Sequence, residues 1–428
     1  MKKIFIIILN VFLFSTVNAE NLNIYVQKAI KNNLKLNAER KNLETAKQNK
    51  IISRSEFFPS LTISGDQIST TSTNRTDQTG TILSDTNLDS ESKTISLEQK
   101  IFSGFKGLNT FKKSELETQK AILELKEVEQ QTILDTASAY FDLKFKEKNK
   151  KFNTSNVKLF ERQVESDNAR LQKGEITLTD LAQSESSLAG AKANLIKAQT
   201  ELLSSITNLK RVIGEKTLKY ENLKEKAIID LPNSLILSQN LSNKKNVRLL
   251  ISELEYEIAV KELNIERSRL SPSATIKVSK SENKDFSTTI DEKDDETVQA
   301  TITWPIIKGG ENISSIKKST LNKQRFQIIL QDTKNEVASQ TSNIWSKYQS
   351  SKSVLEATRA QLKAAEIANE GITQEYDSSN TRTTLEVIQS RSLLLDARIA
   401  FSQAERDFMI SQFELAKQVG SLSLQSFK

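Results

Sequence analysis

A heptad pattern that occurs twice constrains this chain more than any other feature. In the first copy the large side chains every seven residues are Leu181, Leu188, Leu195, Leu202 and Leu209, and in the second they are Val387, Leu394, Phe401, Phe408 and Leu415. A series of small residues runs alongside and is identical in both copies: Ser184, Ala191, Ala198 and Ser205, then Ser390, Ala397, Ala404 and Ser411. Such alternation is typical of a coiled-coil seam. The repetition predicts two copies of one helical unit.

The prolines extend this duplication beyond the seam. Pro59 corresponds to Pro272, and Lys100 to Gly104 correspond to Pro305 to Gly309. Each half is predicted to consist of a helix, a strand, a loop, a strand, a very long helix, a short turn and a second helix. We expect a first repeat at 20–214, a connector at 215–243 and a second repeat at 244–428.

The first residues have the pattern of a secretory signal peptide. Two lysines follow Met1, an apolar run of about 14 residues comes next, and Ala19 ends the segment as a small residue. We expect residues 1–19 to be removed. The alternative, an uncleaved anchor helix, requires about 20 apolar residues. No later segment is apolar enough to predict a membrane-spanning helix.

Alternating apolar and polar residues predict two strands in each half. The apolar positions are Leu61, Ile63, Ile95, Leu97 and Ile101 in the first half, and Ile276, Val278, Val298, Ala300, Ile302 and Trp304 in the second. The polar stretches between them, about 70–92 and 280–296, are expected to be solvated loops.

Two proline-free stretches, about 106–171 and 311–376, are expected to be single helices. At 1.5 Å per residue each would be on the order of 100 Å long. A compact globular core does not need a helix of that length, so these segments suggest elements that bridge a gap.

Four short amphipathic strands leave a sheet with two unpaired edges and an apolar face. A closed barrel in a membrane pairs every strand and places the apolar face in lipid. Small barrels need about eight strands, so the chain would have to oligomerise to build one. A soluble sheet packed against a helix is the alternative.

Composition excludes most catalytic chemistry. The chain has no Cys and no His, so zinc, haem, thiol and imidazole sites are absent, and so are disulfides and a lipidated N-terminal Cys. We expect a protein that is not an enzyme, with no catalytic, cofactor-binding or metal site. The 61 Lys and Arg against 54 Asp and Glu are a modest surplus that does not indicate nucleic-acid binding.

These features together resemble the TolC-type outer-membrane efflux protein family, over essentially the whole mature chain. The resemblance is carried by Trp304 to Gly310 and its counterpart Gln99 to Phe105, by Ala139 to Leu143, by Asn380 to Thr383 and by Val419-Gly420. Each motif is short, and their order, spacing and duplication give the resemblance its specificity.

The resemblance implies a mixed α and β membrane protein that acts as a homotrimer. Three chains would form a 12-stranded barrel in the outer membrane, continued by a trimeric α-barrel of antiparallel coiled-coil helices in the periplasm. The implied partners are outer-membrane lipid, a periplasmic adaptor and an inner-membrane transporter, and the implied function is efflux or type I secretion, gated at the periplasmic helical tip.

Two turns join the long helices to the heptad helices. Thr177 with Asp180, and Thr383 with Glu386, have the spacing of helix-capping pairs. The resemblance assigns gate roles to Thr179, Asp180 and Arg382 and a constriction to Glu386 and Gln389, where Gln389 replaces the family's second acidic residue. It matches Tyr376 to the gate tyrosine one residue out of register. Adaptor contacts are expected at the tip: Gly174, Glu175, Asn380 and Thr381.

The main alternative function is a non-channel structural or adaptor coiled coil in the periplasm with a small soluble β domain. Both hypotheses require long helices, and only the channel requires duplicated amphipathic strands at matching places.

Overall fold

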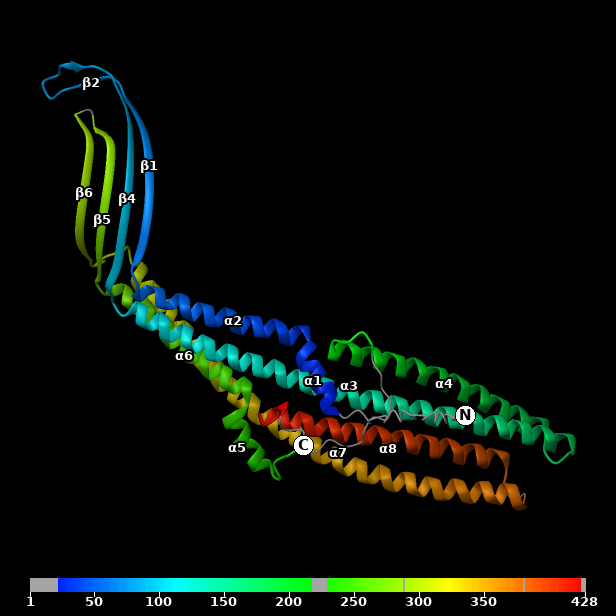
Figure 1. The fold of residues 1–428 in the computed structure, drawn as a ribbon. Coiled ribbons are helices and arrows are strands. Elements are labelled where there is room, and N and C mark those ends of the chain that lie inside the picture. The colour runs from blue at the N-terminus through cyan, green and yellow to red at the C-terminus, as the bar shows by residue number, and fades with distance from the viewer. Residues whose placement is uncertain (1–21, 218–228, 288, 380–381, 425–428) are drawn as a thin grey trace, which may run out of the picture. The chain divides into compact units, whose positions relative to one another are not determined.

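The structure is a computed structural model that describes residues 22–217, 229–287, 289–379 and 382–424 (Figure 1). The expected signal peptide, residues 1–19, lies outside the described residues, and so does part of the expected connector.

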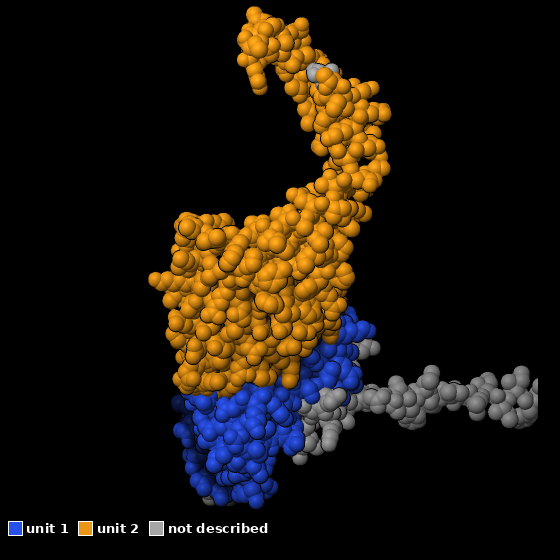
Figure 2. Space-filling view, turned by 90° about the vertical axis from the view of Figure 1, so that its left-hand side faces the viewer, with its two compact units in different colours: residues 1–37, 128–246, 338–428 blue, residues 38–127, 247–337 orange. Residues whose placement is uncertain are grey.

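The chain divides into two compact units (Figure 2). Unit 1 contains residues 1–37, 128–246 and 338–428, and unit 2 contains residues 38–127 and 247–337. Both units therefore draw on both sequence repeats. The two long helices, α3 (Lys106–Gln172) and α7 (Glu311–Ser379), each contribute residues to both units and match the two long helices expected from the sequence.

Unit 2 contains a four-stranded antiparallel sheet in the order β1-β4-β5-β6. Its strands are β1 (Ser60–Ser72), β4 (Thr86–Ser103), β5 (Ser273–Ser287) and β6 (Ile290–Thr303). A small hairpin of β2 (Arg75–Thr76) and β3 (Ile82–Leu83) connects β1 to β4. Short 3₁₀ turns, Ser55–Phe57 and Ser268–Leu270, precede β1 and β5.

The register of the sheet supports the duplication at single-residue level. Leu61 lies opposite Leu97 in the first hairpin, and Ala274 lies opposite Ile302 in the second. In the alignment of the two sequence repeats, Leu61 corresponds to Ala274. The part of the alignment that equates Ile101 with Ile306 also equates Leu97 with Ile302. The two hairpins therefore have the same pairing.

The expected solvated loops at 70–92 and 280–296 were largely wrong. β1 and β4 continue through most of the first stretch, and β5 and β6 continue through most of the second. Sequence periodicity missed these halves of the strands because both of their faces carry polar side chains, so no apolar alternation marks them.

Unit 2 also contains α2 (Leu34–Arg54, mostly within this unit) and α6 (Val247–Arg267). Ion pairs tie the neighbouring helices together: Lys50 with Glu115 at 2.8 Å, and Lys120 with Glu255 at 2.9 Å. Each of these ion pairs remains partly exposed to solvent, so its charges are not fully desolvated.

Unit 1 contains α1 (Leu22–Asn32), α4 (Leu178–Ile213), α5 (Leu235–Lys245) and α8 (Thr384–Gln418) with parts of the long helices. Its main core gathers aromatic and aliphatic side chains around Tyr140, which lies 5.4 Å from the ring of Tyr25, and around Phe413. Tyr140 is thus a packing residue.

The heptad seams lie on α4 and α8. All eight small residues of the two seams are buried, whereas several of the large ones, including Leu195 and Phe401, are only half-buried. The small side chains therefore mark the closest approach of the helices, as expected for knobs that alternate in size.

A glycine ends the heptad helix of each repeat. Gly214 and Gly420 have positive φ values of 70° and 72°. A Cβ atom would lie 2.9 Å from the Asn32 carbonyl oxygen at Gly214 and 2.1 Å from the Lys245 carbonyl oxygen at Gly420. Both glycines are needed for conformation and for space.

Within the described part of the chain, no helix combines the length and apolarity needed to cross a membrane.

Candidate functional site

The first tip turn connects α3, which ends at Gln172, to α4, which begins at Leu178. Gly174 supplies a left-handed residue with φ 72°, and Thr177 caps α4. The Thr177 backbone N–H donates to the Asp180 carboxylate at 2.9 Å, and the Asp180 N–H donates back to the Thr177 hydroxyl at 3.3 Å. The hydrogen bonds from Thr177 lower the pKa of Asp180. Thr179 is exposed, and Glu175 accepts a bond from Arg170 at 3.3 Å.

The second turn repeats this cap. The Thr383 N–H donates to the Glu386 carboxylate at 2.8 Å, which lowers the pKa of Glu386. The Arg382 guanidinium donates to Glu375 at 2.6 Å and to Glu386 at 3.0 Å. Both bonds raise the pKa of Arg382, and the bond to Glu375 has the larger effect. Asn380 and Thr381 lie outside the described residues.

The residues expected to form the gate therefore bond within their own hairpins. Asp180 bonds to Thr177 on the first hairpin, and Arg382 bonds to α7 and α8 on the second. The capping prediction for both turns is confirmed. A closing pair between Asp180 and Arg382 stays a prediction.

Glu386 and Gln389 lie on the wall of a groove between α7 and α8. The groove has a volume of about 430 Å³. The groove is lined by three alanines of α7 and by apolar and polar side chains of both helices: Ala364, Ala365 and Ala368, with Gln361, Ile372, Glu386, Gln389, Ser390 and Leu393. The two expected constriction residues are thus neighbours on one face of α8.

A buried polar cluster joins the two hairpins, and of its residues the sequence had indicated only Tyr376 as a gate residue. Its centre is Asp167 on α3, whose side chain is completely buried. The Asp167 carboxylate accepts bonds from Gln163 at 2.9 Å, from the Tyr376 hydroxyl at 3.0 Å and from the Ser184 hydroxyl. Since Tyr376 is on α7 and Ser184 is on α4, one carboxylate connects three helices. The Tyr376 hydroxyl also lies 3.3 Å from the Thr384 hydroxyl of α8. We call Gln163, Asp167, Ser184, Tyr376 and Thr384 the Asp167 cluster.

Two arginines border the Asp167 cluster. Arg391 of α8 donates to the Gln163 side-chain oxygen at 3.0 Å, and its burial lowers its pKa. The Arg170 guanidinium lies 4.7 Å from the centre of the Tyr376 ring, within cation–π range. Burial raises the pKa of Tyr376, so the phenol keeps the proton that it donates to Asp167.

A faint sequence signal for this cluster exists. Val157, Phe160, Gln163 and Asp167 follow one another at spacings of three and four residues, so the two polar residues continue a buried stripe of α3. A carboxylate in such a stripe must find partners, because an unpaired buried charge is costly. The partners themselves, on α4 and α7, could not be read from that spacing.

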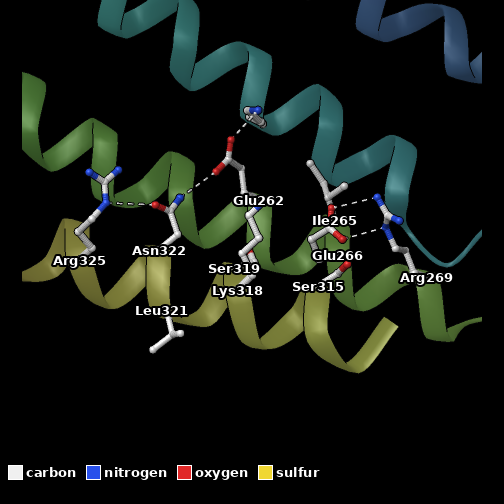
Figure 3. A pocket seen from close by; sticks show the side chains of 11 residues that line it. Glu262, Ile265, Glu266, Arg269, Ser315, Lys318, Ser319, Leu321, Asn322 and Arg325 are labelled. Carbon is white, nitrogen blue, oxygen red and sulfur yellow. Dashed lines mark hydrogen bonds and ion pairs between the residues drawn. The ribbon is translucent and has the colours of Figure 1, made fainter. Parts of the chain in front are cut away.

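A second groove, of about 640 Å³, lies along α6 and α7 in unit 2 (Figure 3). Its charged lining is largely paired: Lys113 lies 2.8 Å from Glu262, and Arg269 lies 2.8 Å from Glu266. Burial by itself would lower the pKa of Lys113, but the ion pair with Glu262 acts in the opposite direction, and the pKa is raised. The pair of Lys113 and Glu262 links α3 to α6.

Three comparisons with known proteins agree with each other. The model of a family described as outer membrane efflux protein matches residues 25–215 and 237–421. The outer membrane efflux protein BepC of Brucella suis is 26% identical over 95% of this chain and 86% of its own length. The outer membrane protein TolC of Vibrio cholerae is 24% identical over 96% and 93%.

Solved structures show the same fold. The CmeC outer membrane channel of Campylobacter jejuni superimposes with a TM-score of 0.82 at 18% identity, covering 94% of this chain and 86% of the other. These matches favour the channel hypothesis over a periplasmic coiled-coil protein with a soluble β domain.

Proposed function

The chain belongs to the outer membrane efflux protein family, whose members are channels and not enzymes, and on that premise we propose that it works as a homotrimeric duct. The protein is located in the outer membrane. In the proposed trimer the sheets of three copies close a 12-stranded barrel. A periplasmic adaptor and an inner-membrane transporter complete the pathway for efflux or type I secretion.

The open sheet is the observation that carries this proposal. Within the described residues, β1 and β6 each have one strand neighbour, so each leaves an edge with unpaired N–H and C=O groups. In a bilayer an open edge is not tolerated, because no water is present to bond it. Pairing β6 of one copy with β1 of the next satisfies both edges and repeats the antiparallel order already present.

The experiment is to purify the chain from outer membranes and to record single channels in a planar bilayer. A heat-modifiable trimer that conducts ions is expected. A protein that remains monomeric in detergent and in the bilayer, with no conductance, would contradict the duct.

We further propose that the Asp167 cluster holds the periplasmic end closed. It links α3 and α4 to α7 through buried hydrogen bonds and so joins the two hairpins of a protomer, whereas the exposed pairs of Arg382 stay within the second hairpin. Exposed ion pairs contribute only about 0–1 kcal/mol, whereas a hydrogen bond to a charged group contributes about 1.5–3 kcal/mol.

Tyr376→Phe tests this gate with little change in shape. The variant removes the hydroxyl that donates to Asp167, so the two hairpins separate more easily and single-channel conductance is expected to rise. Arg382→Ser is the comparison, since its partners lie on its own hairpin. A rise only in Arg382→Ser would instead support a gate that Asp180 and Arg382 close as a pair.

The remaining tip residues keep their proposed roles. Gly174 and Glu175, with Asn380 and Thr381, are proposed to contact the adaptor. Glu386 and Gln389 are proposed to form the constriction, where each copy contributes one acid. The trimer would then carry three ring carboxylates, and Gln389→Asp should increase its selectivity for cations.

A further inference from the structure

The two faces of the sheet differ in exposure. Every second side chain is exposed, and the residues between them are half-buried, up to Ser96 on β4 and from Ser279 to Lys284 on β5. On the half-buried face Thr94 and Ser281 are in hydrogen-bond contact at 2.8 Å. We call the exposed side the open face. In the proposed barrel it is the outer face, since it carries the aliphatic residues.

The open face changes character from one cross-strand row to the next. One row is aliphatic on all four strands: Leu61, Leu97, Val278 and Val298. On its helix side the paired residues are Gln99, Ile276 and Ala300. On its other side the next row is mixed: Ile63, Ile95, Lys280 and Glu296. The two rows after that are charged on β4, β5 and β6: Lys93, Glu282 and Asp294, then Glu91, Lys284 and Glu292. β1 contributes the neutral Gly65 and Gln67 to these rows.

The charged residues form an ordered ladder. Opposite charges face each other across β4 and β5 in the two rows that are charged on these strands, Lys93 with Glu282 and Glu91 with Lys284. Ion pairs also run along the strands, from Lys93 to Glu91 at 2.8 Å and from Lys280 to Glu282 at 3.4 Å. We call the three lysines and five acids of these rows and of the mixed row the charge ladder: Lys93, Lys280 and Lys284, with Glu91, Glu282, Glu292, Asp294 and Glu296.

Hydrocarbon cannot cover the charge ladder, because a charged side chain on the lipid face of a barrel is strongly destabilising at the bilayer midplane and tolerated only near the interface. The aliphatic rows require the opposite environment. Val298 and Ile302, for example, are 77% and 78% exposed in the protomer. The boundary between the two environments therefore falls at the mixed row.

We propose that the open face binds the outer membrane in two layers, with hydrocarbon over the aliphatic rows and the phosphate-bearing headgroups of the outer leaflet over the charge ladder. The lysines of the ladder contact headgroup phosphates, and their acidic neighbours hold the lysine side chains in place. The assignment rests on the proposed barrel, which decides that the open face meets lipid.

Spin labels on β5 test the layering. The chain has no cysteine, so a single substitution places one nitroxide at a chosen position. Val278→Cys, Lys280→Cys and Lys284→Cys sample the aliphatic, mixed and charged rows in the trimer reconstituted into vesicles of phosphatidylethanolamine and phosphatidylglycerol. Collision with apolar oxygen is expected to fall, and collision with a polar nickel complex to rise, from position 278 to position 284.

Two results would overturn the layering. A label at position 284 that collides mainly with oxygen would place the ladder in hydrocarbon. A label there that is shielded from both reagents would show that another protein surface covers it. Channel recordings on the same preparations keep the proposals apart: a conducting trimer with either result removes the layering and leaves the duct intact.

Lysine removal tests the headgroup contact. The triple variant Lys93→Gln, Lys280→Gln and Lys284→Gln is expected to retain several-fold less phosphatidylglycerol than the parent trimer in native mass spectrometry. Lys277→Gln is the matched control, because Lys277 lies on the same strand opposite Glu98, on the other face. Equal retention by the triple variant and the control would show that the ladder does not bind phosphate.

Discussion

At the scale of single residues, this protein depends on a few positions where the backbone or a buried charge leaves no alternative. Gly214 and Gly420 end equivalent helices in the left-handed conformation. Thr177 and Thr383 cap the helices that begin at the two tip turns. Asp167 is held by three donors on three helices. Each of these positions can be changed with one substitution and a matched control.

Gly420→Ala is expected to destabilise the protein more than Gly174→Ala. Both glycines have φ 72°, so both variants carry the left-handed penalty of about 1–2 kcal/mol. At Gly420 the added Cβ would also lie 2.1 Å from the Lys245 carbonyl oxygen, whereas nothing lies within 4 Å at Gly174. Thermal unfolding in detergent measures both, and equal losses would show that the contact relaxes without cost.

The capping carboxylates predict a loss of tip stability in acid. The pKa values of Asp180 and Glu386 are lowered in the folded chain, so their stabilisation is complete above their ordinary values of 3.8 and 4.5. It is lost as the pH falls through the lower, folded values. Amide hydrogen exchange in the first turns of α4 and α8 should therefore accelerate below about pH 4 relative to the helix middles, after correction for intrinsic rates. In Asp180→Asn and Glu386→Gln this pH dependence should be absent at the substituted turn.

At the scale of elements, the repeated seam and the repeated hairpin are the units from which the chain is built. The small seam residues are buried in both copies, and equivalent residues pair in both hairpins. A substitution at one copy should thus have the same consequence at its equivalent in the other.

Ala397→Leu and Ala191→Leu are expected to destabilise by similar amounts, about 1–3 kcal/mol each, because they overpack the closest approach of the helices. Ala397 is 1% exposed and Ala191 is 4% exposed. Ser392→Leu adds a leucine to an exposed position of α8 and serves as the control. Denaturant unfolding of the purified protein gives the comparison; a loss confined to one copy would mean that the seams are not equivalent in packing.

At the scale of the whole molecule, the open edges of the sheet are the feature that one chain cannot satisfy. The repeat itself predicts how they close, because β6 and β1 are the equivalents of β4 and β5. The contact between Thr94 and Ser281 then predicts a contact between Gln299 of one copy and Ile68 of the next.

The double variant Ile68→Cys and Gln299→Cys is therefore expected to form disulfide-linked trimers on oxidation, in a chain that has no other cysteine. Non-reducing gel electrophoresis after heating detects them. Thr62→Cys with Gln299→Cys, which is out of register by several residues, should cross-link far less. Efficient cross-linking of the mismatched pair alone would show that the edges meet in another register.

The sequence by itself determined the local elements and their duplication. Heptads, prolines and glycines specify where helices run, stop and turn, since these signals act over a few neighbouring residues, and the caps at Thr177 and Thr383 were read for the same reason. It also supported the resemblance to the family that the comparisons then showed. The polar halves of the strands were not predicted, because neither of their faces is apolar.

Only the tertiary structure decided which distant residues meet. Asp167 and Tyr376 lie more than 200 positions apart in the sequence and form one bond, and no local pattern specifies that pair. The charge ladder likewise exists only once the register sets Lys93 beside Glu282. The periodicity of a sequence indicates which side of a helix or strand is buried. Tertiary packing determines which residues each buried side chain contacts.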